Sequence, residues 1–572
     1  MKKILFSIFF SIGLLAQESY IDYISPYHPT AVSSEQGMVV SQNYLSSDIG
    51  IEILDKGGNA IDAAVAVGFS LATTLPRAGN LGGGGFMLVY LKEKNEIFYI
   101  DYRSKSPLNS NIKKLFNKKL PRDYKRIDFD VVKKGYKASA IPGSVAGLLD
   151  AHAAFGKLPL EEVLKPVIKQ AKEGIEVSYD LNKAIESSNQ LIEDPESKRI
   201  YFKDNKPLKV GSLMKRPDLA NTFSIISQKG KKGFYEGEIA ERFIEAMNLN
   251  DGFFTLEDFK NYETSIKSPI VGSYRNKLVF TAGPPSGGGV VLLTALNVLS
   301  FFDLSEMDSN SAKTYHLLAE SLRRGHNNRS HQVGDPALYN VPIDTLLSKA
   351  RVSELIDGIS MSKATPSSKI KPLRVINESK DTTHYSIIDA EGNAVSNTYT
   401  LGYSFGSGVT IPGTGILMNN QMNNFAYRYG DSTIEGRVAS PANRFEPGKK
   451  PMSTMAPTMV FDEKGELILI TGSPGGSYIP AAILRVVSGV IDFDLNIGEA
   501  TMLPRIHKDW PYSGLDYEKT ISRDTISILD TLGHQPEPNK TMGSTQSIHI
   551  KDGIIYGYAD LRRPNAGVSI QQ

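Results

Sequence analysis

Apolar residues recur along the chain at two spacings, which together predict a mixture of helices and strands. The helical spacing predicts helices over residues 61–75, 144–155, 160–173 and 312–324. Short apolar runs predict strands over residues 86–91 and 97–102, joined by the charged turn 92–96. After residue 381 strands dominate, with turns at Gly392, Gly413, Gly465 and Gly553. This interleaving indicates one large α/β unit built from stacked layers.

Composition narrows the classes of protein that this pattern allows. The 572 residues are 41% hydrophobic and 22% charged, which excludes a disordered chain, a fibrous repeat and a polytopic membrane protein. The net charge of +2 disfavours nucleic acid as a partner. The chain has no cysteine, so thiolate nucleophiles, cysteine-bound metals and disulfides are excluded.

The amino terminus has the composition of a secretory signal. Lys2 and Lys3 precede an apolar run over residues 4–15, which is too short to span a bilayer, and Ala16 is a plausible last residue of the signal. The alternative is an N-terminal core helix. The signal peptide 1–16 predicts a periplasmic or secreted protein.

Common catalytic motifs do not fit the sequence. The histidines form no HExxH pair, and His326 and His331 do not suit a shared ligand face, so we expect no metal and no other cofactor. The glycines at 82–85 precede a strand, whereas a dinucleotide-binding fingerprint opens a helix. Residues 472–476 resemble a serine-hydrolase elbow only loosely, because Pro474 suits no helix start there.

A hairpin over residues 381–401 remains. Its two β-rich runs flank Ala390-Glu391-Gly392, which predicts a three-residue loop with Gly392 in the left-handed conformation. Pairing Asp389 with Asn393 then places Thr382 opposite Thr400 in antiparallel register. The pattern by itself favours a structural Thr–Thr pair in a half-exposed sheet over a catalytic one.

A family resemblance gives this pair another meaning. The segments that carry it, in order and spacing, are residues 79–86 (GNLGGGGF), 101–103 (DYR), 285–288 (PSGG), 334–336 (GDP), 381–386 (DTTHYS), 398–400 (TYT), 417–422 (LMNNQM), 451–455 (PMSTM), 472–477 (GSPGGS) and 543–547 (GSTQS). Together they resemble the γ-glutamyltransferases, also called γ-glutamyltranspeptidases or glutathione hydrolases. The resemblance covers essentially the whole chain after the predicted signal.

The resemblance implies a four-layer αββα sandwich of the N-terminal-nucleophile hydrolase type. It also implies an inactive precursor that cuts itself between Asp381 and Thr382. The products would be a large subunit, 17–381, and a small subunit, 382–572, interleaved in one catalytic fold as a heterodimer. The implied substrates are a glutathione-like γ-glutamyl compound and an amino acid or peptide acceptor.

Cleavage would create the base that a threonine nucleophile needs. A free α-amine has a pKa near 7.7 to 8.0, so at neutral pH roughly a tenth of it can accept the proton of the Thr382 hydroxyl. The resemblance gives Thr400 the role of orienting that hydroxyl. It gives the backbone N–H groups of Gly475 and Gly476 the role of stabilising the tetrahedral oxyanion.

Further residues are implied to bind the substrate's charged end. Arg103 would clamp the α-carboxylate with help from the Ser453 and Thr454 hydroxyls. Gln421 and Asn424 would face the α-ammonium with their side-chain oxygens. Residues 425–450 fit the lid segment of the family.

The chain departs from the family pattern at the specificity residues. Family members commonly carry Met-Asp-Asp-Phe where this chain has Asn423 and Asn424, and Gly402 replaces a frequent Asn. A missing carboxylate weakens ammonium recognition, so a glutaryl-type acylase or a poly-γ-glutamate hydrolase or ligase stays an alternative. An exported binding protein without catalytic activity is the other alternative.

Overall fold

The computed structural model describes residues 29–115, 129–330, 332–370, 381–427, 441–512, 514–539 and 541–572. The predicted signal peptide therefore lies outside the described residues, as does half of the predicted lid, residues 428–440. Within the described ranges, no helix is long and apolar enough to cross a membrane.

Two seven-stranded antiparallel sheets form the centre of the molecule. The strands of the first sheet are, in spatial order, β1 (Val32–Ser34), β22 (Ile554–Ala559), β21 (Gln546–Lys551), β17 (Leu467–Thr471), β16 (Thr458–Phe461), β11 (Lys277–Thr281) and β10 (Ile270–Tyr274). Those of the second are β23 (Gly567–Ile570), β2 (Met38–Ser41), β12 (Asp381–Ile388), β13 (Ala394–Gly402), β3 (Gly84–Leu91), β4 (Glu96–Tyr102) and β9 (Ser265–Lys267). The predicted strands over 86–91 and 97–102 are thus confirmed as the neighbours β3 and β4.

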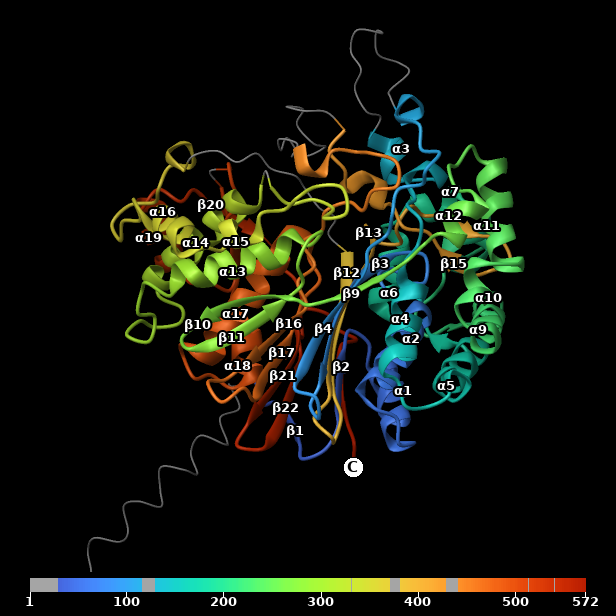
Figure 1. Ribbon diagram of the computed structural model, residues 1–572, viewed down its shortest axis with the longest axis horizontal. Coiled ribbons are helices and arrows are strands. Elements are labelled where there is room, and N and C mark those ends of the chain that lie inside the picture. Colours follow the sequence, from blue (N-terminus) through green and yellow to red (C-terminus); the bar gives the residue numbers. More distant parts are fainter. Residues whose placement is uncertain are drawn as a thin grey trace, which may run out of the picture.

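Helices cover the outer face of each sheet, so the layers follow the order αββα (Figure 1). The second sheet carries α1 (Tyr44–Asp55), α2 (Ala60–Thr74), α4 (Ser144–Phe155), α5 (Leu160–Glu173), α9 (Pro217–Lys229), α10 (Lys231–Tyr235) and α11 (Glu238–Leu249). The first sheet carries α13 (Gly287–Leu299), α14 (Ala312–Arg329), α17 (Ile479–Ile491) and α18 (Ile497–Met502). The predicted fold class is confirmed.

Shorter elements fill the ends and sides of the sandwich. They include α3 (Phe129–Lys133), α6 (Tyr179–Glu186), α7 (Gln190–Glu193), α8 (Pro195–Tyr201), α12 (Leu256–Lys260), α15 (Ile343–Leu346), α16 (Lys349–Ile356) and α19 (Arg523–Thr531). Small sheets pair β5 (Ile175–Glu176) with β8 (Leu213–Met214), β6 (Phe202–Lys203) with β7 (Lys206–Pro207), and β14 (Thr410–Ile411) with β15 (Ile416–Leu417). A further small sheet joins β18 (Ile506–His507), β19 (Leu515–Glu518) and β20 (Pro536–Asn539).

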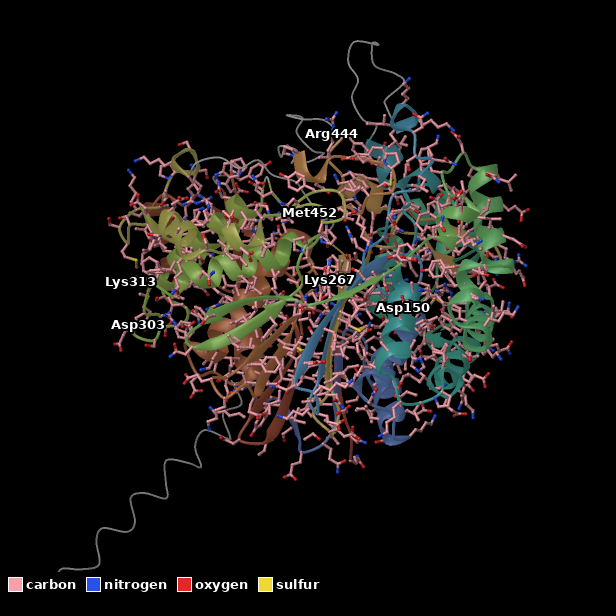
Figure 2. All side chains as sticks on the ribbon, viewed as in Figure 1. Asp150, Lys267, Asp303, Lys313, Arg444 and Met452 are labelled. Atoms are coloured by element: carbon pink, nitrogen blue, oxygen red, sulfur yellow. The ribbon has the colours of Figure 1, made fainter. Side chains whose placement is uncertain are left out.

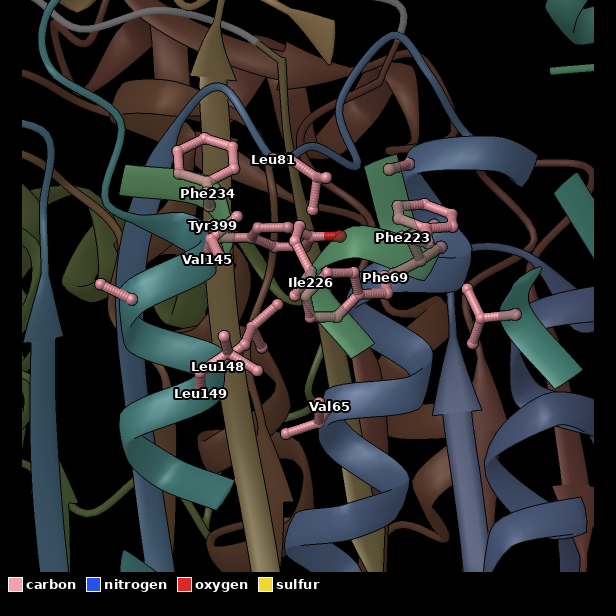
Figure 3. Close-up of a cluster of buried hydrophobic side chains, with 14 of the residues drawn as sticks. Val65, Phe69, Leu81, Val145, Leu148, Leu149, Phe223, Ile226, Phe234 and Tyr399 are labelled. Carbon is pink, nitrogen blue, oxygen red and sulfur yellow. The ribbon is translucent and has the colours of Figure 1, made fainter. Parts of the chain in front are cut away.

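The strands of the second sheet are apolar on both faces because both faces are covered. In β3, Met87 and Val89 belong to the core under the helices, whereas Phe86 and Leu88 belong to the core between the sheets. Figure 3 shows the first of these cores, where Phe69 of α2 meets Phe223 of α9 edge to face, with ring centroids 5.6 Å apart. The central strands are therefore held from both sides, which fixes the positions of residues at their ends.

Three predicted helices agree with the structure to within a residue, and the fourth is longer than expected. Residues 312–324 were predicted, but α14 continues to Arg329. Its last turns carry arginines that are buried, and Arg323 and Arg324 both form ion pairs with Glu320 of the same helix. Pairing within the helix satisfies these charges and allows it to continue inside the protein.

Candidate active site

The predicted hairpin is present as β12 and β13, and its turn has the expected geometry. The backbone N–H of Asp389 donates to the Asn393 carbonyl at 3.0 Å, and Gly392 has φ of +84°. The predicted register is confirmed along most of the ladder, for instance at His384, which pairs with Thr398. The loop residues therefore set the alignment of the two strands.

At the open end the register differs from the prediction. Thr383 pairs with Tyr399, but Asp381 pairs with Gly402, so Thr400 and Leu401 together lie opposite the single residue Thr382. This is a β-bulge, and it replaces the predicted one-to-one Thr382–Thr400 pair. Gly402 provides the physical reason, because its φ of +108° suits glycine and turns the strand out of the ladder.

Despite the bulge, Thr382 and Thr400 line one small pocket, and both are 4% exposed. The open space of about 10 Å³ holds roughly one water molecule. The pocket is lined by Arg103, Thr382, Thr400, Asn424, Ser453, Thr454, Met455, Gly476 and Ile479. Seven of these nine residues were predicted to belong to the site; Met455 and Ile479, which add apolar walls, were not.

Arg103 lies at the end of β4 and is 1% exposed. Its Nε donates to the Pro451 carbonyl at 3.1 Å, and its Nη2 donates to the Met452 carbonyl at 3.3 Å. The same Nη2 donates to Asn424 Oδ1 at 3.0 Å. These bonds fix the direction of the Arg103 guanidinium, and Figure 2 labels Met452, one of its partners. The Asn424 oxygen that was predicted to face an ammonium already accepts a hydrogen bond from Arg103.

The Ser453-Thr454 segment connects this cation with the glycine loop. The backbone of Ser453 accepts from Gly287 N–H at 2.6 Å, at the start of α13. The Thr454 hydroxyl donates to the Gly476 carbonyl at 2.7 Å. A hydroxyl has one donor, so Thr454 braces the glycine loop here. The predicted hydrogen bond from Thr454 to the substrate's α-carboxylate stays a prediction. It requires the Thr454 hydroxyl to rotate away from the Gly476 carbonyl.

Gly475 and Gly476 both have positive φ, of +130° and +58°, so the loop before α17 suits glycine at both positions. The preceding Ser473 Oγ accepts from the backbone N–H of Ser544 at 3.0 Å. The loop is thus tied to the segment that leads into β21. Its predicted role as an oxyanion hole stays a prediction.

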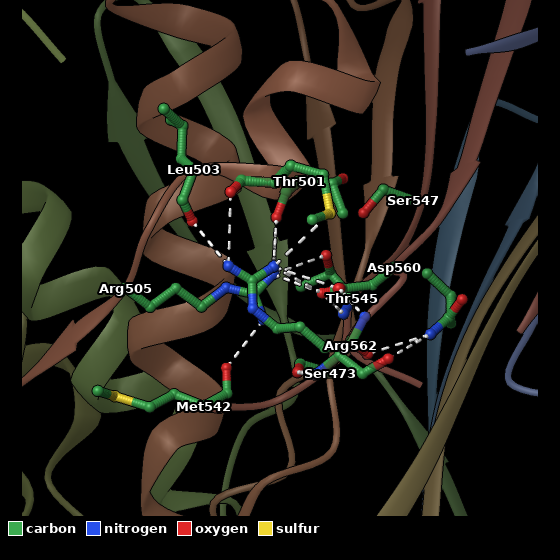
Figure 4. A network of polar contacts seen from close by, with 12 residues as sticks. Ser473, Thr501, Leu503, Arg505, Met542, Thr545, Ser547, Asp560 and Arg562 are labelled. Carbon is green, nitrogen blue, oxygen red and sulfur yellow. Dashed lines mark hydrogen bonds and ion pairs between the residues drawn. The ribbon is translucent and has the colours of Figure 1, made fainter. Parts of the chain in front are cut away.

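A buried charge network stabilises that segment (Figure 4). Arg505 donates to the Met542 carbonyl at 2.8 Å and to Asp560 Oδ2 at 2.7 Å, and Asp560 Oδ2 also accepts from Thr545 N–H at 3.0 Å. The Arg505–Asp560 pair is fully buried. Burial raises the pKa of Asp560, but the positive charges of Arg505 and Arg562 outweigh this effect and hold the pKa below its usual value. The sequence analysis did not find this network, because its members are far apart in the chain.

Gln421 and Asn420 hold the bulge from the other side. Gln421 Nε2 donates to the Thr400 carbonyl at 2.7 Å, while its buried Oε1 has no hydrogen-bond partner within the described part of the chain. Asn420 Oδ1 accepts from Tyr403 N–H at 3.0 Å and would lie 2.0 Å from a Cβ at position 402. Asn420 thus fills the space that the Asn frequent at position 402 in the family would need.

His384 follows Thr382 by two residues in β12, so the alternation of side chains along a strand places both on the same face. Its Nδ1 contacts Thr398 Oγ1 at 2.8 Å and its Nε2 contacts Ser386 Oγ at 3.1 Å. Complete burial lowers the pKa of His384 to about 3, so the ring is neutral at physiological pH. Both ring nitrogens contact hydroxyl groups, so the ring links β12 to β13 at this position.

The layered fold and a threonine at the end of a central strand define the class of N-terminal-nucleophile hydrolases. The sequence profile of the family described as Gamma-glutamyltranspeptidase matches residues 46–570. The chain belongs to this family. It is an enzyme that cleaves γ-glutamyl amide bonds through an acyl ester on threonine and matures by processing itself.

Individual relatives agree with this assignment. The chain is 39% identical over 540 residues to a glutathione hydrolase proenzyme of Escherichia coli (strain K12), covering 94% of this chain and 92% of the relative. It is 33% identical over 544 residues to Acylase ACY 1 proenzyme of Pseudomonas sp. (strain SE83), covering 94% of each. The crystal structure of cephalosporin acylase from Bacillus halodurans superposes with a TM-score of 0.82 at 25% identity, covering 96% of this chain and 98% of that one.

Proposed function

We propose that Thr382 is the nucleophile and that it becomes active when the bond between Asp381 and Thr382 is cut. The observation that carries this proposal is that Thr382 and Thr400 share one buried pocket with Arg103 and Gly476. In the precursor the Thr382 nitrogen is an amide without a basic lone pair. The cut converts this nitrogen into an α-amine, which places a base beside the Thr382 hydroxyl.

The reaction then takes two steps. The α-amine accepts the Thr382 hydroxyl proton while Oγ1 attacks the γ-carbonyl carbon of the substrate, and the oxyanion is stabilised by the Gly475 and Gly476 N–H groups. The C–N bond breaks as the α-amine returns the proton to the leaving nitrogen. Water, or an amine of an amino acid or peptide, attacks the ester and gives its proton to the α-amine, while Oγ1 is released and protonated again.

Substrate recognition follows from the polar groups of the pocket. Arg103 presents a fixed guanidinium suited to the α-carboxylate, and the buried Oε1 of Gln421 can accept from the α-ammonium. The open space of about 10 Å³ is too small for a glutamyl group. The pocket must therefore widen, which the cut permits because Asp381, next to it in β12, is then free to move away.

A second acyl group is also supported by a particular observation. Asn424 replaces a carboxylate and already binds Arg103, so the ammonium has no anionic partner among the predicted substrate residues. A glutaryl group carries the carboxylate without the ammonium and would lose little here. The relatives include acylases as well as glutathione hydrolases, which fits either substrate.

The proposal extends to maturation and location. We expect a large subunit of residues 17–381 and a small subunit of residues 382–572 that stay together. The basic start and apolar run at the amino terminus support export to the periplasm or the medium. Glutathione released outside the cytoplasm would then be a substrate.

Intact-mass analysis of the purified protein tests maturation directly. We expect two polypeptides, of about two thirds and one third of the mass, with the smaller one beginning at Thr382. Thr382→Ala should give one uncut chain without activity. Serine at this position keeps a hydroxyl, so Thr382→Ser is the matched variant that should still be cut. A single-chain wild-type protein that turns over γ-glutamyl substrates would refute the mechanism.

A further inference from the structure

Strand β23 lies at the edge of the second sheet, next to β2. An open groove of about 610 Å³ lies along this edge, lined by five residues of α1 and by Val568, Ser569 and Ile570 of β23. All three strand residues are half-buried, so solvent reaches them. Figure 1 shows the carboxyl end of the chain, which follows β23, near α1. A sheet edge in this position can pair with a further strand.

The hydrogen bonds to β2 determine which backbone groups of β23 face the groove. Gln571 N–H donates to the Gly37 carbonyl at 2.8 Å, and these residues lie opposite each other in the antiparallel register. Bonded and non-bonded pairs alternate along such a ladder, so Ser569 bonds to β2, whereas the N–H and C=O groups of Val568 and Ile570 point away from it. Within the described ranges, neither Val568 nor Ile570 hydrogen-bonds to a third segment.

The edge is held in place by α1. The Ser569 hydroxyl donates to Asp48 Oδ1 at 2.6 Å, and the Ser47 hydroxyl donates to the Gly567 carbonyl at 2.9 Å. The backbone N–H of Tyr44 donates to the carbonyl of Asn565, just before the strand, at 2.9 Å. The strand is therefore ordered before any partner binds, which reduces the entropy cost of pairing with it.

The groove is acidic, although the protein as a whole has a net charge of +2. The charged residues of its lining are Asp48, Glu52, Asp55 and Lys56. Lys56 forms an ion pair with Glu52 at 2.6 Å, so the excess negative charge lies at Asp48 and Asp55, both of which are exposed. A field of this sign favours a cationic partner.

Helix α1 and β23 run side by side with matching spacing. Tyr44 lies against Gly567, and Asp48 bonds to Ser569, so four helical residues correspond to two strand residues. The lengths agree, because four helical residues rise about 6 Å and two strand residues about 6.7 Å. Acidic side chains on successive turns of α1 would therefore face every second side chain of a strand added to β23.

We propose that β23 and α1 form a docking site for an extended, basic segment of another protein, which adds a strand to the second sheet. Its backbone would hydrogen-bond to Val568 and Ile570, while Lys or Arg at every second position would reach Asp48 and Asp55. A second copy of this chain fits less well, because pairing of β23 with itself would bring two acidic helices together. The inference does not depend on the proposed role of Thr382.

A synthetic peptide tests the backbone pairing. The probe is a fluorescent peptide of alternating lysine and threonine, about eight residues long, and its anisotropy is measured with the wild-type protein. We expect saturable binding of this peptide and no binding of the glutamate–threonine version at the same concentration. Only alternate N–H groups of an added strand face β23. N-methylation of either all lysines or all threonines should therefore weaken binding about thirtyfold, the size of two backbone hydrogen bonds, and the other set should be tolerated. Equal effects of the two sets would refute strand addition.

Variants and hydrogen exchange identify the site. Asp55→Asn should weaken binding about threefold, the effect of one exposed ion pair. Asp530→Asn, an exposed aspartate in the last turn of α19, is the matched control and should bind as the wild type does. At saturating peptide, the N–H groups of Val568 and Ile570 should exchange about tenfold more slowly. Binding without this protection would place the peptide elsewhere and overturn the proposal. A dimer in analytical ultracentrifugation that the peptide dissociates would make a second copy the occupant and would also overturn it.

Discussion

The exchange Asn424→Asp should shift the enzyme toward γ-glutamyl and away from glutaryl substrates. Asn424 is 2% exposed and accepts a hydrogen bond from Arg103 at 3.0 Å. An aspartate there keeps one oxygen on Arg103 and turns the other toward the substrate ammonium. A glutaryl group has no ammonium, and its carboxylate must compete with the new carboxylate for Arg103.

The size of the shift follows from the type of contact that is exchanged. A hydrogen bond with a charged partner is worth about 1.5 to 3 kcal/mol, against about 0.5 to 1.5 kcal/mol for a neutral one. A net gain of about 1.4 kcal/mol corresponds to roughly tenfold in kcat/KM for γ-glutamyl substrates. A loss of similar size for glutaryl substrates makes the ratio of the two change by about a hundredfold.

The assay compares kcat/KM for γ-glutamyl and glutaryl p-nitroanilide in the wild type and in two variants. Asn423→Asp introduces the same charge one residue away, at a half-buried position outside the pocket lining, and serves as the matched control. We expect the ratio to change in Asn424→Asp and to stay within about threefold in Asn423→Asp. An unchanged ratio in Asn424→Asp would show that this residue does not face the acyl group's amine.

Three other changes test the supports of the site. Arg505→Gln leaves Asp560 buried without one of its two arginines, so we expect a loss of about 3 kcal/mol in the free energy of unfolding. The measurement is a urea titration of the uncut Thr382→Ala protein with and without this exchange. A loss below about 1 kcal/mol would contradict the role of the network. Burial lowers the pKa of His384 from 6.5 to about 3, so between pH 3 and pH 6.5 the unfolded state binds more protons than the folded state. The contribution of His384 to the free energy of unfolding is therefore complete above pH 6.5 and falls as the pH drops toward 3. The fall should approach about 2 kcal/mol from this residue between pH 6.5 and 5, and His384→Asn should flatten it; equal slopes would rule His384 out as the cause. Thr454→Val removes the donor to the Gly476 carbonyl and should lower kcat about tenfold with little change in KM, whereas a change in KM alone would place Thr454 on the substrate.

The alignment of the hairpin could be predicted because it depends on neighbouring residues. The Asp389 to Asn393 turn is encoded by a glycine with positive φ, and this fixes the pairing of every residue up to Thr383. The bulge at Thr382 could not be derived in this way. It depends on Gly402 and on the side chain of Asn420, which lies in a different segment and packs against that glycine.

Long-range packing also explains what the sequence pattern missed elsewhere. Helix α13 begins with three glycines and is buried on nearly every side, so it shows no amphipathic period. Its start is set by the Ser286 side chain, which accepts from the Gly289 N–H at 3.2 Å. The residues of the pocket itself were reached through the family resemblance, since an isolated arginine or glycine pair carries no signal of function.

The place of β12 in the sheet has a consequence for the lifetime of the mature enzyme. This strand and β13 are hydrogen-bonded between β2 and β3, so strands from both sides of the proposed cut alternate within one ladder. Before the cut, all of these strands belong to one polypeptide, so refolding needs only one molecule. Afterwards, separated pieces would have to find each other again at their dilute concentration, without the tether that once kept them close. Maturation would thus replace a one-molecule refolding step with a two-molecule one, so the lifetime of the mature enzyme would depend on how slowly its two pieces separate.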